Sequence, residues 1–292
     1  MKIQYLNGGL ANQIFQYIFY RYYQIHAKDE IWLDDMKFFR IREHNGYELE
    51  RVFGLKPRLL SSFFEPDVWE YMVNAAGGNG GDLCQMLKDQ GMDIIMVAEA
   101  KNYVYSGTVY HAKTSQYHPE LVNIPGNVYF FGYWINKEWF ARLRDTLMAE
   151  LVFPAITGEE NLAHADTIRR ETCVSVHIRR GDFVSLDWHL PAEFYQVAMK
   201  NMAKLLPGAT YLIFSDDIPW CKDNWRELGL NLAGDKLIFV TGNAGENSYM
   251  DLDLMSRCHG MVIANSAFSY FAALYNGRED KTVVNLAPYR EV

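Results

Sequence analysis

One short stretch constrains the fold of this chain more than any other. The apolar run Cys173–Ile178 passes directly into Arg179, Arg180, Gly181 and Asp182, which is typical of a buried strand that stops where charge begins. In open α/β sheets ligands bind beyond the carboxyl ends of the strands, so two guanidinium groups there favour an anion, above all phosphate. The alternative is an ion-pair cluster of both arginines with Asp182. Gly181 favours the phosphate clamp, because glycine permits close approach of the backbone to a ligand.

The composition indicates a globular protein that does not bind nucleic acid through a general basic field. Of 292 residues, 49% are hydrophobic and 22% charged, enough for two domains or one large one with a sizeable core. The net charge of −8 requires any bound anion to be held locally. Four scattered cysteines predict buried thiols in a reducing compartment. Without an apolar leader or a run long enough to span a membrane, the protein is expected to be cytoplasmic.

A strand, a glycine turn and a long helix are expected at the start of the chain. The strand is predicted at residues 2–6 and the helix at 14–27, with its phenylalanines and tyrosines in the core. The turn at Gly8 and Gly9 can bring helix N-terminal amides to an anion or a sugar hydroxyl. It can also be only a tight connection, with Asn12 as a helix cap. The spacing is not GxGxxG, which disfavours a nicotinamide or flavin dehydrogenase.

The rest of the N-terminal half is expected to hold three strands and one helix, at residues 31–35, 94–97, 128–133 and 137–151. Asp34 and Asp35 at the end of the first strand are interpreted as solvated loop carboxylates. The aromatic segment 129–134 is a candidate surface for a sugar ring. The glycine-rich segment 74–81 is either a lid or an idle insertion.

Residues 153–156 are the best candidate for an interdomain linker, which divides the chain into domains 1–155 and 156–292. In the second domain strands and helices alternate with short connections, which predicts a parallel, doubly wound sheet. The expected strands are 173–178, 210–214, 237–240, 261–264 and 282–285. Thr157 and Glu160 have the spacing of a capping box and would open a helix that ends at Arg170. Residues 184–190 are expected to form a short loop.

Polar residues follow the last apolar residue of three of these strands. The three clusters are His177 with Arg179 and Arg180, Ser215 with Asp216 and Asp217, and Asn265 with Ser266. Because the carboxyl ends of parallel strands meet at one edge, all three are expected to form a single ligand site. The turn that contains Ser266, Phe268 and Ser269 begins a helix, so its amides and hydroxyls could bind phosphate together with the arginines.

Asp251 and Asp253 match the DxD pattern with which one class of glycosyltransferases holds a divalent metal. They lie in an expected helix, where residues two apart diverge around the axis and cannot easily chelate one ion. Asp251 is therefore interpreted as a single ligand contact and Asp253 as a solvated side chain. No metal site is predicted.

Four segments in series resemble the bacterial-type α-1,2-fucosyltransferases of glycosyltransferase family 11. They are residues 8–17 (GGLANQIFQY), 177–182 (HIRRGD), 214–217 (FSDD) and 251–273. The resemblance implies inverting transfer of L-fucose from GDP-fucose to the 2-hydroxyl of a terminal galactose, with no essential metal or other cofactor. It implies an α/β, GT-B-like fold of two Rossmann-like domains with the active site in the cleft between them. Domain 1–155 would lie on the acceptor side and 156–292 would bind GDP-fucose.

The partners implied by the resemblance are GDP-fucose and a galactose-terminated glycan of a bacterial surface polysaccharide, with peripheral membrane association where that glycan is lipid-linked. By analogy with related α-1,6- and protein-O-fucosyltransferases, His177 and Asp251 would contact guanine, Arg179 the β-phosphate, and Arg180 would support the arginine pair. Residues 266–269 would contact the phosphates. The other residues assigned to the donor are Gly8, Gly9, Ser215, Asp216 and Asn265.

Asn12 would lie near the anomeric carbon, and a carboxylate would act as the base. Asp187 lies ten positions after His177, the offset of a proposed glutamate base in the α-1,6 relatives. Asp182 is closer to the clamp, where a cationic neighbour weakens a carboxylate as a base. His189 is a third candidate. Two alternatives remain open: another GT-B glycosyltransferase with a different sugar nucleotide, and a non-catalytic GDP-sugar-binding module.

Overall fold

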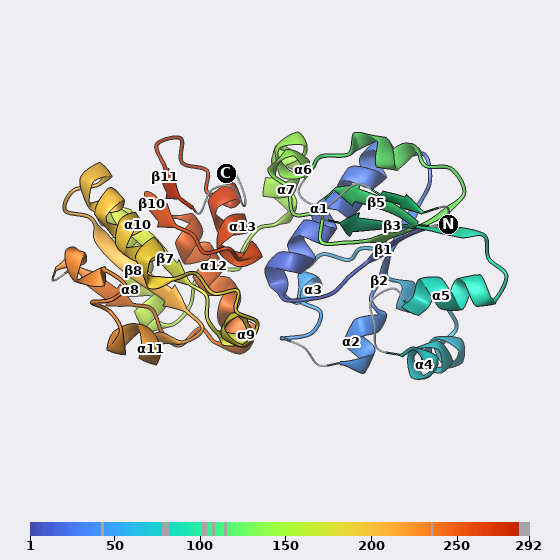
Figure 1. The fold of residues 1–292 in the computed structure, drawn as a ribbon, viewed down its shortest axis with the longest axis horizontal. Helices are drawn as coiled ribbons and strands as arrows, with labels where there is room; N and C mark the ends of the chain where they lie inside the picture. The colour runs from blue at the N-terminus through green and yellow to red at the C-terminus, as the bar shows by residue number, and fades with distance from the viewer. Residues whose placement is uncertain are drawn as a thin grey trace. The chain divides into compact units, whose positions relative to one another are not determined.

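The computed structural model describes residues 1–41, 44–77, 82–100, 104–106, 109–113, 116–234 and 236–285. The chain forms two compact units, Met1–Val152 and Phe153–Val292, each with its own sheet and flanking helices (Figure 1). The boundary expected after residue 155 falls in the same irregular connecting segment. The roles expected for the two domains stay predictions.

The N-terminal unit is built on a six-stranded sheet in the order β2-β1-β6-β3-β5-β4. Only the β4–β5 pair is antiparallel among the strand pairs of the described residues. The strands are β1 (Lys2–Tyr5), β2 (Ile31–Asp34), β3 (Ile94–Ala100), β4 (Val104–Ser106), β5 (Val109–Lys113) and β6 (Asn127–Phe131). The helices are α1 (Leu10–His26), α2 (Met36–Arg40), α3 (Leu49–Phe53), α4 (Pro66–Ala75), α5 (Asp82–Asp89), α6 (Lys137–Arg142) and α7 (Arg144–Glu150), with 3₁₀ turns at Leu60–Ser62 and Pro119–Asn123.

The two faces of this sheet bury different side chains because successive residues of a strand point to opposite faces. On one face, Tyr129 of β6 belongs to a core cluster with Trp69 of α4 and Leu83 of α5. On the other face, the neighbouring Phe130 contacts Phe19 of α1, with ring centroids 5.2 Å apart. The prediction that the α1 aromatics are core is therefore confirmed.

The aromatic segment 129–134 is mostly core rather than a surface for a sugar ring. Tyr129, Phe130 and Trp134 are buried, and Trp134 stacks on Phe19 with ring centroids 4.5 Å apart. Tyr133 is the exposed exception. The prediction of a sugar-binding surface is wrong for the buried rings, because both faces of β6 are covered by helices.

Two helix boundaries differ from the expectation. Helix α1 begins at Leu10, with Gly9 as its N-cap, so Asn12 lies inside the first turn and is not a cap. The helix expected at 137–151 is divided into α6 and α7, because Leu143 between them leaves helical geometry (φ −120°, ψ 15°). Of the glycine-rich segment 74–81, residues 78–81 lie outside the described residues.

Asp34 and Asp35 are buried, so their interpretation as solvated loop carboxylates is wrong. Asp34 is 2% exposed and accepts hydrogen bonds from the Tyr129 hydroxyl at 2.5 Å and the Met36 amide at 3.1 Å. Asp35 accepts from the amide and the hydroxyl of Ser61. Burial raises the pKa of Asp34 to about 6. The sequence pattern had suggested that water solvates these two carboxyls. In the folded chain, hydrogen bonds from protein groups replace that water.

The C-terminal unit is built on a five-stranded, all-parallel sheet in the order β11-β10-β7-β8-β9, which confirms the doubly wound prediction. The strands are β7 (Cys173–Ile178), β8 (Thr210–Ser215), β9 (Leu237–Phe239), β10 (Gly260–Val262) and β11 (Thr282–Val284). The helices are α8 (Glu159–Arg170), α9 (Gly181–Ser185), α10 (Ala192–Leu205), α11 (Ile218–Asp223), α12 (Ser248–Ser256) and α13 (Ala267–Tyr275), with 3₁₀ turns at Leu230–Ala233 and Gly245–Asn247.

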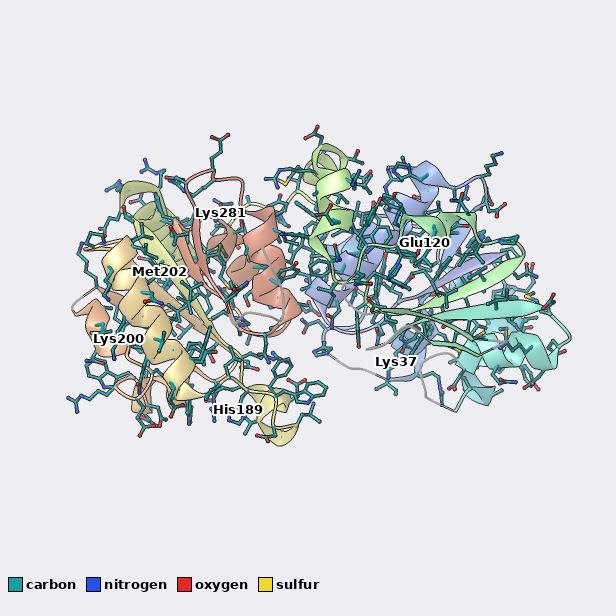
Figure 2. The ribbon with its side chains drawn as sticks, turned by 45° about the horizontal axis from the view of Figure 1, so that its top comes forward. Lys37, Glu120, His189, Lys200, Met202 and Lys281 are labelled. Atoms are coloured by element: carbon teal, nitrogen blue, oxygen red, sulfur yellow. The ribbon has the colours of Figure 1, made fainter. Side chains whose placement is uncertain are left out.

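Helix α10 covers one face of this sheet and α13 lies on the other. Met202 of α10 is fully buried against β7 and β10, whereas Lys200, on another side of the same helix, is exposed (Figure 2). Val174 and Val176 of β7 face α10. His177 points to the opposite face and contacts α13. Helix α12 contacts both α8 and α13.

Three local predictions for this unit are wrong. The N-cap of α8 is Gly158, so Thr157 lies outside the helix and forms no capping box. Asp253 is 4% exposed and pairs with Arg257 at 2.6 Å, because the buried face of α12 takes it out of water. The segment after Asp182 is not only a loop, since it begins with the short helix α9.

Two whole-chain expectations can be compared with the structure. The four cysteines are buried and free, as predicted. No helix among the described residues has the length and apolar character needed to cross a membrane.

Candidate functional site

Direct contacts join two of the three polar clusters that were expected at one edge of the C-terminal sheet and connect the first of them to α13. The Arg180 amide donates a hydrogen bond to Asp216 Oδ1 at 2.8 Å, which links the ends of β7 and β8. His177 Nδ1 lies 2.8 Å from Ser269 Oγ, which links β7 to α13. The structure therefore brings together side chains from the carboxyl ends of β7 and β8 and from the helix that follows β10.

Two carboxylates and an aromatic ring orient the guanidinium group of Arg179. Its Nη2 lies 2.5 Å from Asp182 Oδ1 and its Nη1 lies 2.9 Å from Asp216 Oδ2. The guanidinium carbon lies 5.3 Å from the centre of the Phe183 ring. Arg179 Nε is buried and has no hydrogen-bond partner among the described residues. Of the ion-pair cluster considered as the alternative, the structure contains the Arg179–Asp182 pair, whereas Arg180 pairs with Asp217 instead.

Arg180 is held by a different set of groups. Its guanidinium carbon lies 3.4 Å from the ring centre of Trp220, and its Nε lies 3.3 Å from Asp217 Oδ2. Asp217 also caps α11 by accepting from the Trp220 amide at 3.1 Å. Ser215 Oγ accepts from the Asp217 amide at 3.0 Å, so Ser215 shapes this turn. The sequence reasoning missed Trp220, although an aromatic residue in the first turn after a strand end was a usable signal.

Gly181 is required here for a reason other than ligand approach. Its φ is +26°, and a Cβ atom would lie 2.5 Å from Asp216 Oδ2. Any other residue would therefore displace the carboxylate that pairs with Arg179. Glycine is needed at this position because the turn after β7 lies directly against Asp216, in the turn after β8.

His177 is a buried, neutral imidazole. The side chain is 6% exposed, and burial together with the Arg179 charge lowers its pKa to about 3. Ser269, which the resemblance assigned to the phosphates, is fully buried and contacts His177 Nδ1. Phe268 lies beside the imidazole, with ring centroids 5.7 Å apart. Ser266 is the N-cap of α13 and accepts from the Phe268 amide at 3.3 Å.

Asp187 lies in the segment that follows the arginines and α9. Asn265 follows β10 and contacts that segment. Asn265 Nδ2 donates to the Trp188 carbonyl at 2.8 Å, while its Oδ1 is buried without a partner in the described part of the chain. Asp187 is exposed and takes a left-handed backbone conformation, with φ +55°. His189 Nδ1 is likewise buried with no described partner.

Asp251 is the last member of a hydrogen-bonded chain of three side chains, which also contains Asn243 and Asn161. Its Oδ1 accepts from Asn243 Nδ2 at 2.7 Å, and Asn243 and Asn161 exchange two hydrogen bonds of 2.8 Å. Burial raises the pKa of Asp251 to about 6, against the opposing effect of the Asn243 hydrogen bond. The sequence reasoning gave Asn161 and Asn243 no role. Asn243 follows β9, so its place after a strand end was the available signal.

The residues predicted near the start of the chain lie in the N-terminal unit and are described there by themselves. Gly8 has φ +78°, and a Cβ atom on it would lie 2.7 Å from Asn12 Nδ2. Gly9 is the N-cap of α1. The Leu10 amide already donates to the carboxylate of the buried Glu48. The Leu10 amide therefore already has a carboxylate acceptor, and that carboxylate is itself paired with Arg51.

A metal centre has no visible basis in the part of the chain that the structure describes. It contains no group of three or more His, Cys, Asp and Glu side chains that could hold a metal ion. The two carboxyls of the DxD pattern have separate partners, since Asp251 contacts Asn243 and Asp253 contacts Arg257.

Comparisons with known proteins identify relatives that transfer sugars. The family model of glycosyl transferase family 11 matches residues 101–291. An alpha-1,2-colitosyltransferase of Escherichia coli is 27% identical over 275 residues, which cover 92% of this chain and 85% of that protein. The galactoside 2-alpha-L-fucosyltransferase SEC1 of Bos taurus is 26% identical over 167 residues, 53% of this chain and 44% of the relative.

A solved structure shares the fold. The fucosyltransferase NodZ from Bradyrhizobium superposes with a TM-score of 0.53 at 12% sequence identity, over 99% of this chain and 95% of that one. The expected class, an α/β and GT-B-like fold with two Rossmann-like units, is confirmed. The expected position of the active site between the units stays a prediction.

Proposed function

Because the chain belongs to glycosyl transferase family 11, we propose that it transfers L-fucose from GDP-fucose to the 2-hydroxyl of a terminal β-galactoside. The observation that carries the proposal is the oriented Arg179 guanidinium at the carboxyl end of β7, with its buried Nε–H unpaired among the described residues. Similarity to α-1,2-fucosyltransferases supports the choice of fucose and of the galactoside acceptor.

Arg179 would stabilise the charge that develops when the bond from fucose C1 to the diphosphate breaks. The negative charge of the departing GDP grows on the β-phosphate, and a preorganised donor directed at such a charge is worth about 10² to 10³ in rate. Arginines that stabilise a phosphoryl transition state contribute about 10³ to 10⁵. Asp182 and Asp216 hold the guanidinium in place beforehand, so little ordering is left for the reaction itself. Arg180 adds a second positive charge beside it.

His177 and Asp251 would recognise the guanine base. Guanine carries adjacent N–H donors on its N1 and N2 atoms, which match the two oxygens of one carboxylate. The Asn243 hydrogen bond fixes the orientation of Asp251, and Ser269 fixes that of the neutral His177 ring. The amides at the start of α13, beyond Ser266, would contact the phosphates.

Asp187 is the proposed base that takes the proton of the acceptor 2-hydroxyl. General-base assistance is usually worth about 10² to 10⁴ in rate. Asp187 is exposed, whereas the nearby Asp182 is bound to Arg179 at 2.5 Å. The ion pair occupies Asp182, so Asp187 is the carboxylate left for the acceptor hydroxyl. Asn12 would contact the fucose or the acceptor near the anomeric carbon.

A second candidate donor is GDP-colitose. The relative that covers 92% of this chain is an alpha-1,2-colitosyltransferase. Colitose is fucose without its 3-hydroxyl, so both donors would present the same nucleotide and leaving group to Arg179. The two reactions differ only in whether a protein group pairs with that hydroxyl.

An assay of sugar transfer tests the proposal. Purified protein in excess EDTA is incubated with a β-galactoside and with GDP-fucose or GDP-colitose, and both the glycan product and GDP are measured. We expect a fucosylated product with GDP-fucose, none with the 2-deoxygalactoside, and a rise in melting temperature with GDP but not with UDP or CDP. A faster reaction with GDP-colitose would assign that donor instead. GDP binding without transfer to any galactoside would support a non-catalytic module and contradict the proposal.

A further inference from the structure

The segment that follows the arginines exposes three apolar side chains. Val184, Leu186 and Trp188 all face solvent, and Trp188 is 58% exposed. Most large aromatic side chains of this unit are buried or half-buried, so an exposed indole next to the proposed ligand site is unusual. We propose that Trp188 is the platform on which the acceptor sugar ring stacks. This inference rests on the proposed function and names its acceptor subsite.

The position of Trp188 relative to Arg179 supports this role. The Trp188 ring contacts Phe183 edge to face, with ring centroids 5.8 Å apart. The Phe183 ring in turn lies 5.3 Å from the Arg179 guanidinium carbon. Two successive contacts thus connect the indole to the group proposed to hold the β-phosphate. The acceptor must lie beside the sugar that this phosphate carries, since its 2-hydroxyl attacks the carbon bonded to the phosphate.

The backbone under the exposed ring is held firmly. The Trp188 amide donates to the Phe183 carbonyl at 2.8 Å, and the Trp188 carbonyl accepts from Asn265 Nδ2 at 2.8 Å. The preceding Asp187 takes φ +55°, a left-handed conformation that is uncommon for a residue other than glycine and persists only where the surroundings impose it. A ring on a fixed backbone loses little entropy on binding. This arrangement suits a binding surface better than a mobile loop would.

The charges of the segment select the kind of ligand. Asp182 and Asp187 flank Val184 and Leu186, Asp187 directly precedes Trp188, and the whole chain has a net charge of −8. An anionic membrane surface would be repelled by these carboxylates. A neutral sugar instead offers hydroxyls to the carboxylates and an apolar face of C–H groups to the indole. The chemistry therefore favours a neutral pyranoside such as the proposed β-galactoside.

Substitution of Trp188 tests the inference with readouts that separate acceptor from donor. For Trp188→Ala we expect the acceptor KM to rise about tenfold, with unchanged GDP affinity and an unchanged KM for the donor. Trp188→Phe keeps an aromatic ring and should restore most of the acceptor affinity. Leu186→Ala is the matched control, because it removes an exposed apolar side chain of the same segment; its acceptor KM should stay within about twofold.

Direct binding gives a measurement independent of turnover. Saturation-transfer NMR with methyl β-galactoside in the presence of GDP should show contact with the wild type and a weaker signal for Trp188→Ala. An unchanged acceptor KM in both Trp188 variants would overturn the inference. It would also be overturned if the only effect of Trp188→Ala were a loss of binding to vesicles of anionic lipid. Failure of the proposed function differs from both outcomes, since the wild type itself would then transfer no sugar to a β-galactoside, whether or not it binds GDP.

Discussion

Ser269 holds the imidazole ring of His177 in place. The hydroxyl oxygen of Ser269 lies 2.8 Å from His177 Nδ1, and both side chains are buried. With Nδ1 occupied in this way, the direction of the ring is determined by α13 rather than by a ligand. We therefore expect Ser269 to act as a positioning residue for His177, while its expected phosphate contact stays a prediction.

Replacement of that hydroxyl should weaken both the fold and nucleotide binding. Ser269→Ala leaves a buried ring nitrogen without its partner, which costs about 1 to 3 kcal/mol in the free energy of unfolding. GDP affinity should fall as well, because the ring loses its orientation. Ser256→Ala is the control, since Ser256 also makes a buried hydrogen bond, to the Asp253 carbonyl at 2.7 Å. It should lower stability without changing GDP affinity in calorimetric titration.

Loss of the Arg179 guanidinium should abolish transfer and spare the fold. Arg179→Ala removes the guanidinium proposed to stabilise the leaving phosphate, so we expect turnover to drop by about 10³ or more. Arg179→Lys keeps the charge but not the fork that both aspartates hold, and should recover only part of the activity. Arg278→Ala, which removes a surface arginine paired with Asp280, should retain wild-type turnover. A folded and active Arg179→Ala enzyme would rule out the clamp.

Gly181 should tolerate substitution less well than Gly208 does. Both glycines have positive φ, so alanine strains the backbone at either site by about 1 kcal/mol. At Gly181 the new Cβ would also lie 2.5 Å from Asp216 Oδ2, whereas nothing lies within 4 Å at Gly208. Transfer activity should therefore fall in Gly181→Ala and persist in Gly208→Ala. Equal activities at equal stability would show that Asp216 does not position Arg179.

Asp187→Asn should depress turnover more than donor affinity. Asparagine tolerates the left-handed conformation that Asp187 takes, so the backbone is preserved while the proposed base is lost. We expect kcat to fall by about 10² to 10⁴, with little change in the Kd for GDP. Steady-state kinetics with a β-galactoside measures the difference. An unchanged kcat would transfer the role to Asp182 or to no residue.

The raised pKa of Asp34 should make the free energy of unfolding of the N-terminal unit fall as the pH rises. Burial raises the pKa of Asp34 to about 6, so the folded protein keeps a proton that the unfolded chain releases near pH 4. This contribution is complete below about pH 4 and is lost as the pH rises through about 6. A difference of about two pKa units corresponds to about 3 kcal/mol.

Denaturant unfolding between pH 4 and 7 checks this pH dependence. Asp34→Asn should flatten the pH profile, because the substituted side chain no longer binds a proton. Asp67→Asn, a change of an exposed carboxyl on α4, should leave the profile as in the wild type. A profile for Asp34→Asn that matches the wild type would show that Asp34 titrates normally in the fold.

The course of the C-terminal sheet could be predicted because its strands are short apolar runs that end in charge. Residues 173–178 form β7 as expected, and β8 differs from its prediction only by the inclusion of Ser215. Parallel strand order then places the strand ends on one edge, so the convergence of Arg179 with Asp216 needed no long-range information. Capping and helix breaks were less predictable, as Thr157 and Leu143 show.

The amino-acid sequence alone was enough to establish the alternation of strands and helices, the position of the arginines at a strand end and the resemblance to a family of sugar transferases. The partner that each polar group takes follows only from the folded chain. Ser269 and His177 are 92 positions apart in the chain, and Asp34 meets Tyr129 across 95. Periodicity reports which face of an element is apolar, but the burial of a polar group depends on a distant hydrogen-bond partner that replaces water.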